Sequence, residues 1–152
     1  MTSVLFVCLG NICRSPLAEG ALRAEAVRRG LDLHVESAGT GNWHAGEPPD
    51  PRAIAAARRR GVDISGQRAR QVRTEDFRTF DLILALDRQN LRDLMSIAPA
   101  DATARLRLLL DHTPGREGQD VADPWYGEDA DFDLTWSEVT RAASGLADGL
   151  EA

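Results

Sequence analysis

The hydrophobic residues of this chain form short apolar segments that alternate with longer segments of helical periodicity. Val4–Val7 is a continuous apolar run, which suits a strand that is buried on both faces of a sheet. Three further segments have the length and composition of strands, at residues 33–37, 82–86 and 105–109. The pattern therefore predicts about four strands, separated by segments long enough to form helices.

The segments between these strands carry helix signals. One helix is expected to begin at Pro16 and to end at Gly30, a residue type that favours the left-handed conformation of a helix C-cap. Its predicted apolar stripe is Leu17, Ala21, Ala24 and Val27. A second helix opens at Pro51 and runs to about residue 60, and a third is expected near residues 88–97. The last helix has the clearest apolar stripe, formed by Phe132, Trp136, Val139, Ala143, Leu146 and Leu150.

Alternating strands and helices are typical of a parallel sheet with crossover helices. Right-handed crossovers lead to an open, doubly wound sheet, whose ligands bind beyond the carboxyl ends of the strands. A chain of 152 residues is long enough to bury a substantial core. We therefore expect residues 1–152 to form a single α/β domain, with an open parallel sheet of about four strands and helices on both faces.

Composition excludes several classes of function. The 18 basic and 24 acidic residues give a net charge of −6, so non-specific binding of nucleic acid is not expected. The chain has neither an apolar run long enough to span a membrane nor the basic and apolar stretches of a signal peptide, which makes the cytoplasm the expected location. Two cysteines are too few for a disulfide framework, and no Cys/His set has the spacing of a zinc site.

The chemically richest segment lies between the first strand and the first helix and reads Cys8-Leu9-Gly10-Asn11-Ile12-Cys13-Arg14-Ser15. The amides of a small-residue loop converge before a helix N-terminus, and the helix dipole adds positive potential there. Such a loop cradles an oxyanion and favours the thiolate of Cys8. Gly10 lets the amides approach the ligand, and Asn11 tolerates a left-handed backbone. The planar guanidinium of Arg14 can bind two oxygens of a phosphoryl group.

Several segments resemble the low-molecular-weight protein tyrosine phosphatases, and the likeness covers nearly the whole chain. The segment from Cys8 to Pro16 resembles their phosphate-binding loop, and residues 37–40, 43–46 and 49–53 resemble a second signature. Residues 80–87 resemble the third strand of that family, and residues 123–127 resemble the loop that carries the general acid. The cysteine-x5-arginine spacing alone also occurs in unrelated phosphatases and arsenate reductases, so the specificity comes from the ordered set of matches.

The resemblance implies a protein-tyrosine-phosphate phosphohydrolase that works through a phosphocysteine on Cys8, without a cofactor or metal. Arg14 would clamp the phosphoryl group, together with the loop residues Leu9, Gly10, Asn11, Ile12, Cys13 and Ser15. The resemblance also implies that the Ser15 hydroxyl donates to the Cys8 thiolate, whereas its position alone makes Ser15 an equally good N-cap of the following helix. The expected partner is a tyrosine-phosphorylated protein, for example a tyrosine kinase.

A leaving tyrosine oxygen needs a proton, which a carboxylic acid on a separate loop can supply. Asp123 is the first choice because Pro124 stiffens the chain after it, and because the resemblance implies this role. On position alone, Asp120 and Asp129 are alternatives. Residues 112–125 are polar and rich in Gly, Pro and Asp, which predicts a mobile surface loop. Three aromatic side chains are predicted to wall a slot for the aryl ring: Trp43, Trp125 and Tyr126.

One loop position has two interpretations, and one position outside the loop departs from the family pattern. Cys13 is either a small buried apolar residue or the partner that forms a disulfide with an oxidised Cys8. Many members of the family carry a histidine at the position of Gln67, where it holds the loop asparagine, here Asn11. Glutamine can donate the same hydrogen bond without titrating.

Three other functions compete with this interpretation. Arsenate would fit the same loop, but its reduction requires further cysteines, and both cysteines of the chain lie in the loop. Phosphoarginine phosphatases resemble the chain but tend to have threonine at the position of Ile12, whose apolar side chain suits an aryl ring better. A phosphate-binding module without catalysis would not need the combination of Cys8, Arg14 and Asp123.

Overall fold

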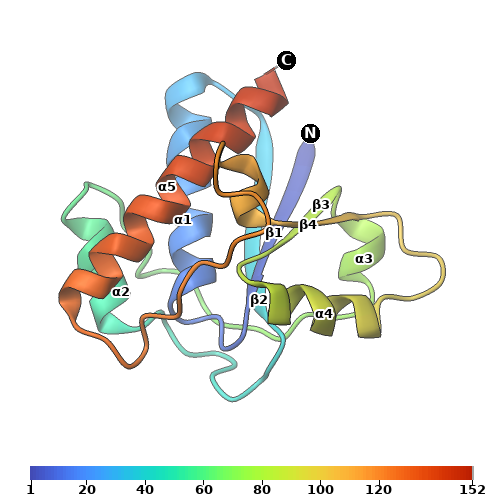
Figure 1. Ribbon diagram of the computed structural model, residues 1–152, viewed down its shortest axis with the longest axis horizontal. Coiled ribbons are helices and arrows are strands. Elements are labelled where there is room, and N and C mark those ends of the chain that lie inside the picture. Colours follow the sequence, from blue (N-terminus) through green and yellow to red (C-terminus); the bar gives the residue numbers. More distant parts are fainter. Residues whose placement is uncertain (152) are drawn as a thin grey trace.

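The computed structural model describes residues 1–151 and has an α/β architecture built on one four-stranded sheet (Figure 1). The strands are β1 (Thr2–Cys8), β2 (Leu33–Gly39), β3 (Leu82–Ala85) and β4 (Arg105–Leu108). All neighbouring strands are parallel, and their order across the sheet is β2-β1-β3-β4. The predicted open parallel sheet of about four strands is confirmed.

Helices cover both faces of the sheet, as predicted (Figure 1). One face is covered by α1 (Arg14–Arg29), α2 (Pro51–Arg58) and α5 (Asp129–Glu151), together with the 3-10 turn η1 (Leu109–His112). The other face is covered by α3 (Asp76–Thr79) and α4 (Arg88–Ile97). The short helix α3 was not predicted, because four residues are too few to establish a helical periodicity.

The central strand β1 supplies side chains to two separate cores. Val4, Phe6 and Cys8 belong to the core beneath α1 and α5, whereas Leu5 and Val7 belong to the core beneath α3 and α4. Both faces of β1 are therefore buried, which is the physical reason for its unbroken apolar run. The stripe predicted for α5 is also found in the first core, with Phe132, Trp136, Val139, Ala143 and Leu146 buried and Leu150 packed against them.

Two predictions about α1 are wrong. The helix begins at Arg14 rather than at Pro16, and Cys13 occupies the N-cap position without a side-chain hydrogen bond, so Ser15 does not cap the helix. Val27 is 84% exposed, because the buried face is centred on Leu17, Leu22 and Ala26, about one residue further around the helix. The predicted left-handed C-cap at Gly30 is confirmed, with φ 69°.

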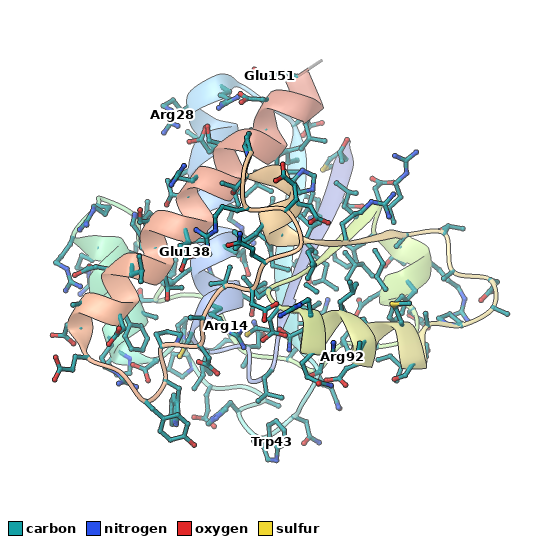
Figure 2. All side chains as sticks on the ribbon, in the orientation of Figure 1. Arg14, Arg28, Trp43, Arg92, Glu138 and Glu151 are labelled. Atoms are coloured by element: carbon teal, nitrogen blue, oxygen red, sulfur yellow. The ribbon has the colours of Figure 1, made fainter. Side chains whose placement is uncertain are left out.

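The carboxyl ends of β1 and β3 lie at one end of the sheet, where three loops meet. These loops follow β1, β2 and η1, and each contributes residues to the same cavity. Figure 2 shows Trp43 at this end of the molecule, opposite Arg28 and Glu151, with Arg14 between them. Within residues 1–151 no helix has the length and apolar character needed to cross a bilayer.

Candidate active site

A cavity of about 200 Å³ opens at the carboxyl end of β1, where the sequence predicted a binding site. Its floor is formed by the 8–15 loop, and its walls come from residues 43–44 and from the segment 122–128, which we call the 122–128 loop. Every predicted catalytic and pocket residue lines it: Cys8, Arg14, Trp43, Asp123, Trp125 and Tyr126. Of the predicted loop residues, Ser15 alone does not line the cavity and lies buried behind it.

The Cys8 sulfur is surrounded by hydrogen-bonding groups of the 8–15 loop. The backbone N–H of Asn11 donates to Sγ at 3.3 Å, and the hydroxyl of Ser15 lies 3.0 Å from Sγ. Asn11 has φ 58°, the left-handed backbone predicted for it. Of the two roles considered for Ser15, contact with Cys8 is therefore the one present in the structure.

Arg14 is buried and is oriented by two groups outside the loop. Its Nη1 atom lies 2.7 Å from Oδ2 of Asp87 and donates to the carbonyl of Val121 at 2.9 Å. Burial alone would lower the pKa of Arg14, but the charges of Cys8 and Asp87 and the hydrogen bond to Asp87 raise it, so the guanidinium stays charged. Sequence reasoning assigned no role to Asp87. Its position directly after β3, beside the strand that ends in Cys8, was the available signal.

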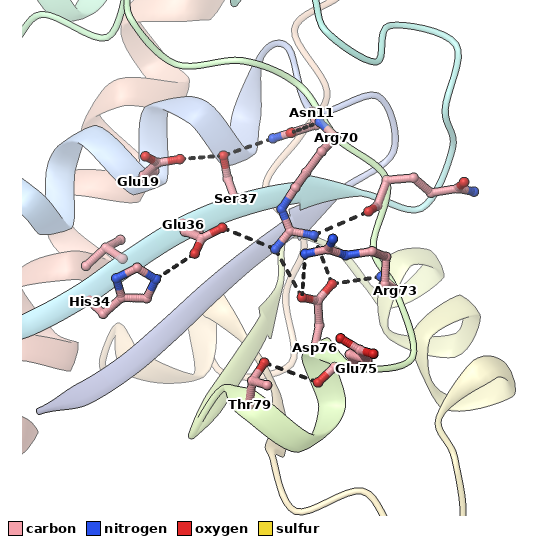
Figure 3. A network of polar contacts seen from close by, with 12 residues as sticks. Asn11, Glu19, His34, Glu36, Ser37, Arg70, Arg73, Glu75, Asp76 and Thr79 are labelled. Carbon is pink, nitrogen blue, oxygen red and sulfur yellow. Dashed lines mark hydrogen bonds and ion pairs between the residues drawn. The ribbon is translucent and has the colours of Figure 1, made fainter.

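Asn11 connects the loop to a polar network behind it (Figure 3). Its amide nitrogen donates to Ser15 at 2.8 Å and to Ser37 at 3.0 Å, and its side-chain oxygen accepts from the backbone N–H of Arg70 at 3.0 Å. The Ser37 hydroxyl donates in turn to buried Glu19 at 2.6 Å. Burial raises the pKa of Glu19, and this effect outweighs the hydrogen bond from Ser37.

Gln67 does not make the hydrogen bond to Asn11 that a glutamine at this position could donate. Ser37, at the end of β2, and the backbone of Arg70 make the hydrogen bonds instead, because both lie next to the loop. The side-chain oxygen of Gln67 is buried and has no hydrogen-bond partner among residues 1–151.

A partly buried ion pair fixes the segment that bonds Asn11. The guanidinium of Arg70 donates to both carboxylate oxygens of Asp76, at 2.9 and 3.1 Å, and to Glu36 at 3.3 Å (Figure 3). The backbone of Arg70 also accepts from Gly39 at 2.8 Å. Sequence reasoning missed this support, since Glu36 and Gly39 lie far from Arg70 in the chain and Asp76 belongs to no motif.

Cys13 differs from Cys8 in its surroundings, although both are free thiols. Burial raises the pKa of Cys13 far above its ordinary value of 9.0, and the charges of Asp50 and Cys8 raise it further. The Cys13 thiol is therefore neutral and unsuited to act as a nucleophile. Its burial agrees with the first interpretation of this residue, and a disulfide with Cys8 stays a prediction.

Asp123 lies at the mouth of the cavity with a side chain that is 45% exposed. One carboxylate oxygen accepts from the backbone N–H of Trp125 at 3.1 Å, and the other lies 3.6 Å from Nη2 of Arg14. Asp120 instead accepts from Arg88, and Asp129 is the first residue of α5. Of these three carboxylates only Asp123 lines the cavity.

Aromatic side chains form the outer walls of the cavity. Trp43 and Tyr126 are largely exposed, while Trp125 is partly covered. His44 also lines the cavity, with its ring centre 6.0 Å from that of Trp125, and was not among the predicted pocket residues. Trp136 is buried in the core, as expected. No cluster of three His, Cys, Asp or Glu side chains suited to a metal ion occurs among residues 1–151.

Comparisons with known proteins point to one family. The sequence profile described as "Low molecular weight phosphotyrosine protein phosphatase" matches residues 3–152. The low molecular weight protein-tyrosine-phosphatase YfkJ of Bacillus subtilis is 44% identical over 128 residues, which cover 83% of this chain and 82% of that protein.

Two solved structures are similar over almost the whole chain. A protein tyrosine phosphatase from Entamoeba histolytica, crystallised with Hepes in its active site, has a TM-score of 0.93 and 31% identity, covering 99% of this chain and 97% of that one. The arginine phosphatase YwlE, a Bacillus subtilis protein, has a TM-score of 0.90 and 28% identity, covering 99% of this chain and 96% of that one.

Proposed function

Because this chain belongs to the low molecular weight phosphotyrosine protein phosphatases, we propose that it hydrolyses phosphotyrosine in proteins through a phosphocysteine on Cys8. The observation that carries this proposal is the position of the Cys8 sulfur on the cavity floor, within 3.3 Å of the Asn11 N–H and 3.0 Å of the Ser15 hydroxyl. Both groups can donate to a thiolate, which is the nucleophilic form of the side chain.

In the first step the Cys8 thiolate attacks phosphorus in line with the tyrosine oxygen. A sulfur–phosphorus bond forms and the phosphorus–oxygen bond of the ester breaks. The loop amides and the guanidinium of Arg14 bind the equatorial oxygens and stabilise the charge that develops on them. Arg14 is prepared for this role because Asp87 and the carbonyl of Val121 hold its Nη1 side.

Asp123 serves both steps from the mouth of the cavity. As an acid it gives its proton to the departing tyrosine oxygen, so that the product leaves as a neutral phenol. The resulting carboxylate then removes a proton from water as the water oxygen attacks the phosphocysteine. Phosphate is released, the thiolate of Cys8 returns, and Asp123 is protonated again.

The cavity walls favour an aryl ester. Ile12 contributes an apolar surface at the floor, and Trp43, Trp125 and Tyr126 border the path from the floor to solvent. A phenyl ring can pack between such groups, and aromatic pairs contribute beyond the area they bury. A tyrosine-phosphorylated protein, for example a tyrosine kinase, is accordingly the proposed partner. Hydrolysis of phosphoarginine is the competing activity, because the arginine phosphatase YwlE shares the fold.

The proposal is tested by the turnover of an aryl phosphate together with the affinity for inorganic phosphate. Cys8→Ser should abolish turnover and leave phosphate affinity largely intact. Arg14→Lys should lose both, because an ammonium group cannot make two parallel hydrogen bonds to a phosphoryl group. Arg92→Lys, on the exposed side of α4, is the matched control and should behave like the wild type. Turnover by Cys8→Ser within about tenfold of the wild type would contradict the covalent mechanism.

A further inference from the structure

Two carbonyl groups of the 122–128 loop, which carries Asp123 and Trp125, accept hydrogen bonds from one side chain. Arg52, from the first turn of α2, donates to the carbonyl of Gly127 through Nη1 at 3.1 Å and to that of Trp125 through Nη2 at 3.2 Å. Among residues 1–151, no other side chain donates to a carbonyl of this loop. Arg52 does not line the cavity, so it does not contact the reacting groups.

Arg52 is itself fixed on two sides. Its Nε and Nη2 atoms each lie 3.0 Å from a different carboxylate oxygen of Asp50, which is the N-cap of α2. Its guanidinium lies over the buried ring of Phe132, with the central carbon 4.5 Å from the ring centre. A charged group held by a bidentate carboxylate and an aromatic face keeps one orientation.

The same group also connects the two loops of the site. The backbone N–H of Asp50 donates to the carbonyl of Ile12 at 2.8 Å, so Asp50 is tied to the 8–15 loop. On the other side, the guanidinium of Arg52 lies 5.6 Å from the ring centre of Trp125. A continuous path of contacts therefore runs from the floor of the cavity, through Asp50 and Arg52, to the 122–128 loop.

We propose that Arg52 is a positioning residue that sets the place of Asp123 and Trp125 relative to Cys8. This inference rests on the proposed function, in which Asp123 delivers the leaving-group proton. A proton donor must lie within hydrogen-bond reach of the oxygen that it protonates, so a displaced loop slows the chemical step. Binding of the phosphoryl group depends on the 8–15 loop and Arg14, and loss of Arg52 leaves it intact.

The test compares Arg52→Met with Arg59→Met. Methionine keeps a long apolar side chain over Phe132 but has no donors. Arg59, at the end of the same helix, pairs with Asp133 of α5. Among residues 1–151 it forms no hydrogen bond or ion pair with the 122–128 loop, so it controls for the loss of an arginine that joins α2 to α5. For each variant, kcat/KM, which reports the step that cleaves the ester, is measured on a series of aryl phosphates of increasing leaving-group pKa, and inorganic phosphate is measured as a competitive inhibitor.

We expect Arg52→Met to lower kcat/KM roughly 10–100-fold for phosphotyrosine, with a smaller loss for a nitrophenyl ester, whose phenolate leaves with little help. The inhibition constant of phosphate should change less than about twofold, since no phosphoryl contact is removed. For Arg59→Met, kcat/KM should depend on leaving-group pKa as it does for the wild type. If Arg52→Met is too unstable to purify, Arg52→Lys, which retains the charge but cannot bond Asp50 and both carbonyls together, should show the same trend.

The double variant Arg52→Met/Asp123→Asn separates positioning from general loss of stability. If Arg52 acts through Asp123, removing Arg52 from the Asp123→Asn enzyme should lower kcat/KM little further. The inference would be overturned if Arg52→Met lowered kcat/KM as strongly in the Asp123→Asn enzyme as in the wild type. It would also be overturned if kcat/KM of Arg52→Met depended on leaving-group pKa in the same way as kcat/KM of the wild type. If Asp123→Asn alone leaves that dependence unchanged, the acid assignment in the proposed function fails instead.

Discussion

The Oδ2 atom of Asp87 lies 2.7 Å from the Nη1 atom of Arg14, and both side chains are largely shielded from solvent. Together with the carbonyl of Val121, this contact occupies one terminal nitrogen of the guanidinium. Among residues 1–151 no hydrogen bond uses Nε or Nη2 of Arg14. Nη2 forms an ion pair with Oδ2 of Asp123 at 3.6 Å, a longer contact that leaves these two donors able to bind two oxygens of a phosphoryl group.

This relationship predicts that Asp87 is needed to orient Arg14. Asparagine at this position can still cap α4, where Asp87 accepts from the backbone of Asn90, but it lacks the charge that holds the guanidinium. Hydrogen bonds to charged groups contribute about 1.5–3 kcal/mol, so Asp87→Asn should lower kcat/KM for an aryl phosphate roughly 10–100-fold. Asp93→Asn, on the same helix, is the control. An unchanged kcat/KM in Asp87→Asn would show that Arg14 is oriented without this carboxylate.

Trp43 should determine preference for aryl over alkyl phosphates. Trp43→Ala removes a wall of the cavity, and the loss of one aromatic contact should reduce that preference roughly two- to tenfold. The measurement is the ratio of kcat/KM for phosphotyrosine and phosphoserine peptides, with Trp43→Phe expected to restore most of it. A ratio that is the same in the wild type and Trp43→Ala would contradict the proposed wall. Faster hydrolysis of phosphoarginine than of phosphotyrosine by the wild type would reassign the substrate.

Much of the fold could be predicted because burial of a strand or helix in the core leaves a recognisable pattern of apolar residues in the sequence. The two-sided burial of β1 makes its apolar run continuous, and the stripe from Phe132 to Leu146 follows one face of α5. The 8–15 loop was recognised because its nucleophile, its arginine and its glycine lie within one short segment. Asp123 was chosen over Asp120 and Asp129 because the family resemblance implied its role as general acid, whereas its position alone left all three carboxylates as candidates.

The remaining parts of the site depend on contacts between distant segments. Asp87, Arg52 and Arg70 act through partners from other elements, and no spacing in the sequence relates them. Ser15 illustrates a local ambiguity: a serine before a helix is a good N-cap, yet here the helix begins at Arg14 and the hydroxyl turns toward Cys8. Gln67 illustrates a question that sequence position left open, and in the structure Ser37 is a partner of Asn11 instead.

The ion pair between Asp50 and Arg52 predicts a pH-dependent contribution to stability. Burial alone would raise the pKa of Asp50, but hydrogen bonds from the side chain and backbone of Arg52 outweigh it and lower that pKa below its ordinary value of 3.8. A carboxyl group whose pKa is lowered on folding stabilises the folded state above pH 3.8, and this contribution is lost as the pH falls below that value.

Asp50→Asn should therefore reduce the free energy of unfolding by about 1–3 kcal/mol at pH 7, because it removes a charged hydrogen-bonding partner while keeping a capping side chain. Urea unfolding of both proteins between pH 7 and pH 3 measures the difference. The two curves should converge at the acid end. A difference that stays constant over the whole range would rule out the charge of Asp50 as its cause.

Asp123 should be needed most where the leaving group is poor. Asp123→Asn should lower kcat/KM for phosphotyrosine about 10²–10⁴-fold, the usual contribution of a general acid, and should lower kcat/KM for an activated nitrophenyl ester much less. Phosphate affinity should hold, since the equatorial oxygens are bound by Arg14 and the loop. The measurement is kcat/KM against leaving-group pKa for the wild type and Asp123→Asn. Parallel lines for wild type and variant would mean that another group, with Asp120 or Asp129 the next to examine, supplies the proton.

The most direct test of the mechanism is to trap the covalent intermediate. The enzyme is mixed with an aryl phosphate, quenched in acid during turnover, and digested, and the peptide containing Cys8 and Cys13 is analysed by mass spectrometry. Cys13→Ser, which removes the neutral neighbouring thiol, serves to assign the label. The mechanism predicts one phosphoryl group on Cys8 in the wild type and in Cys13→Ser, and none on sulfur in Cys8→Ser. A phosphoryl group on another residue, or turnover without any phosphorylated cysteine, would contradict it.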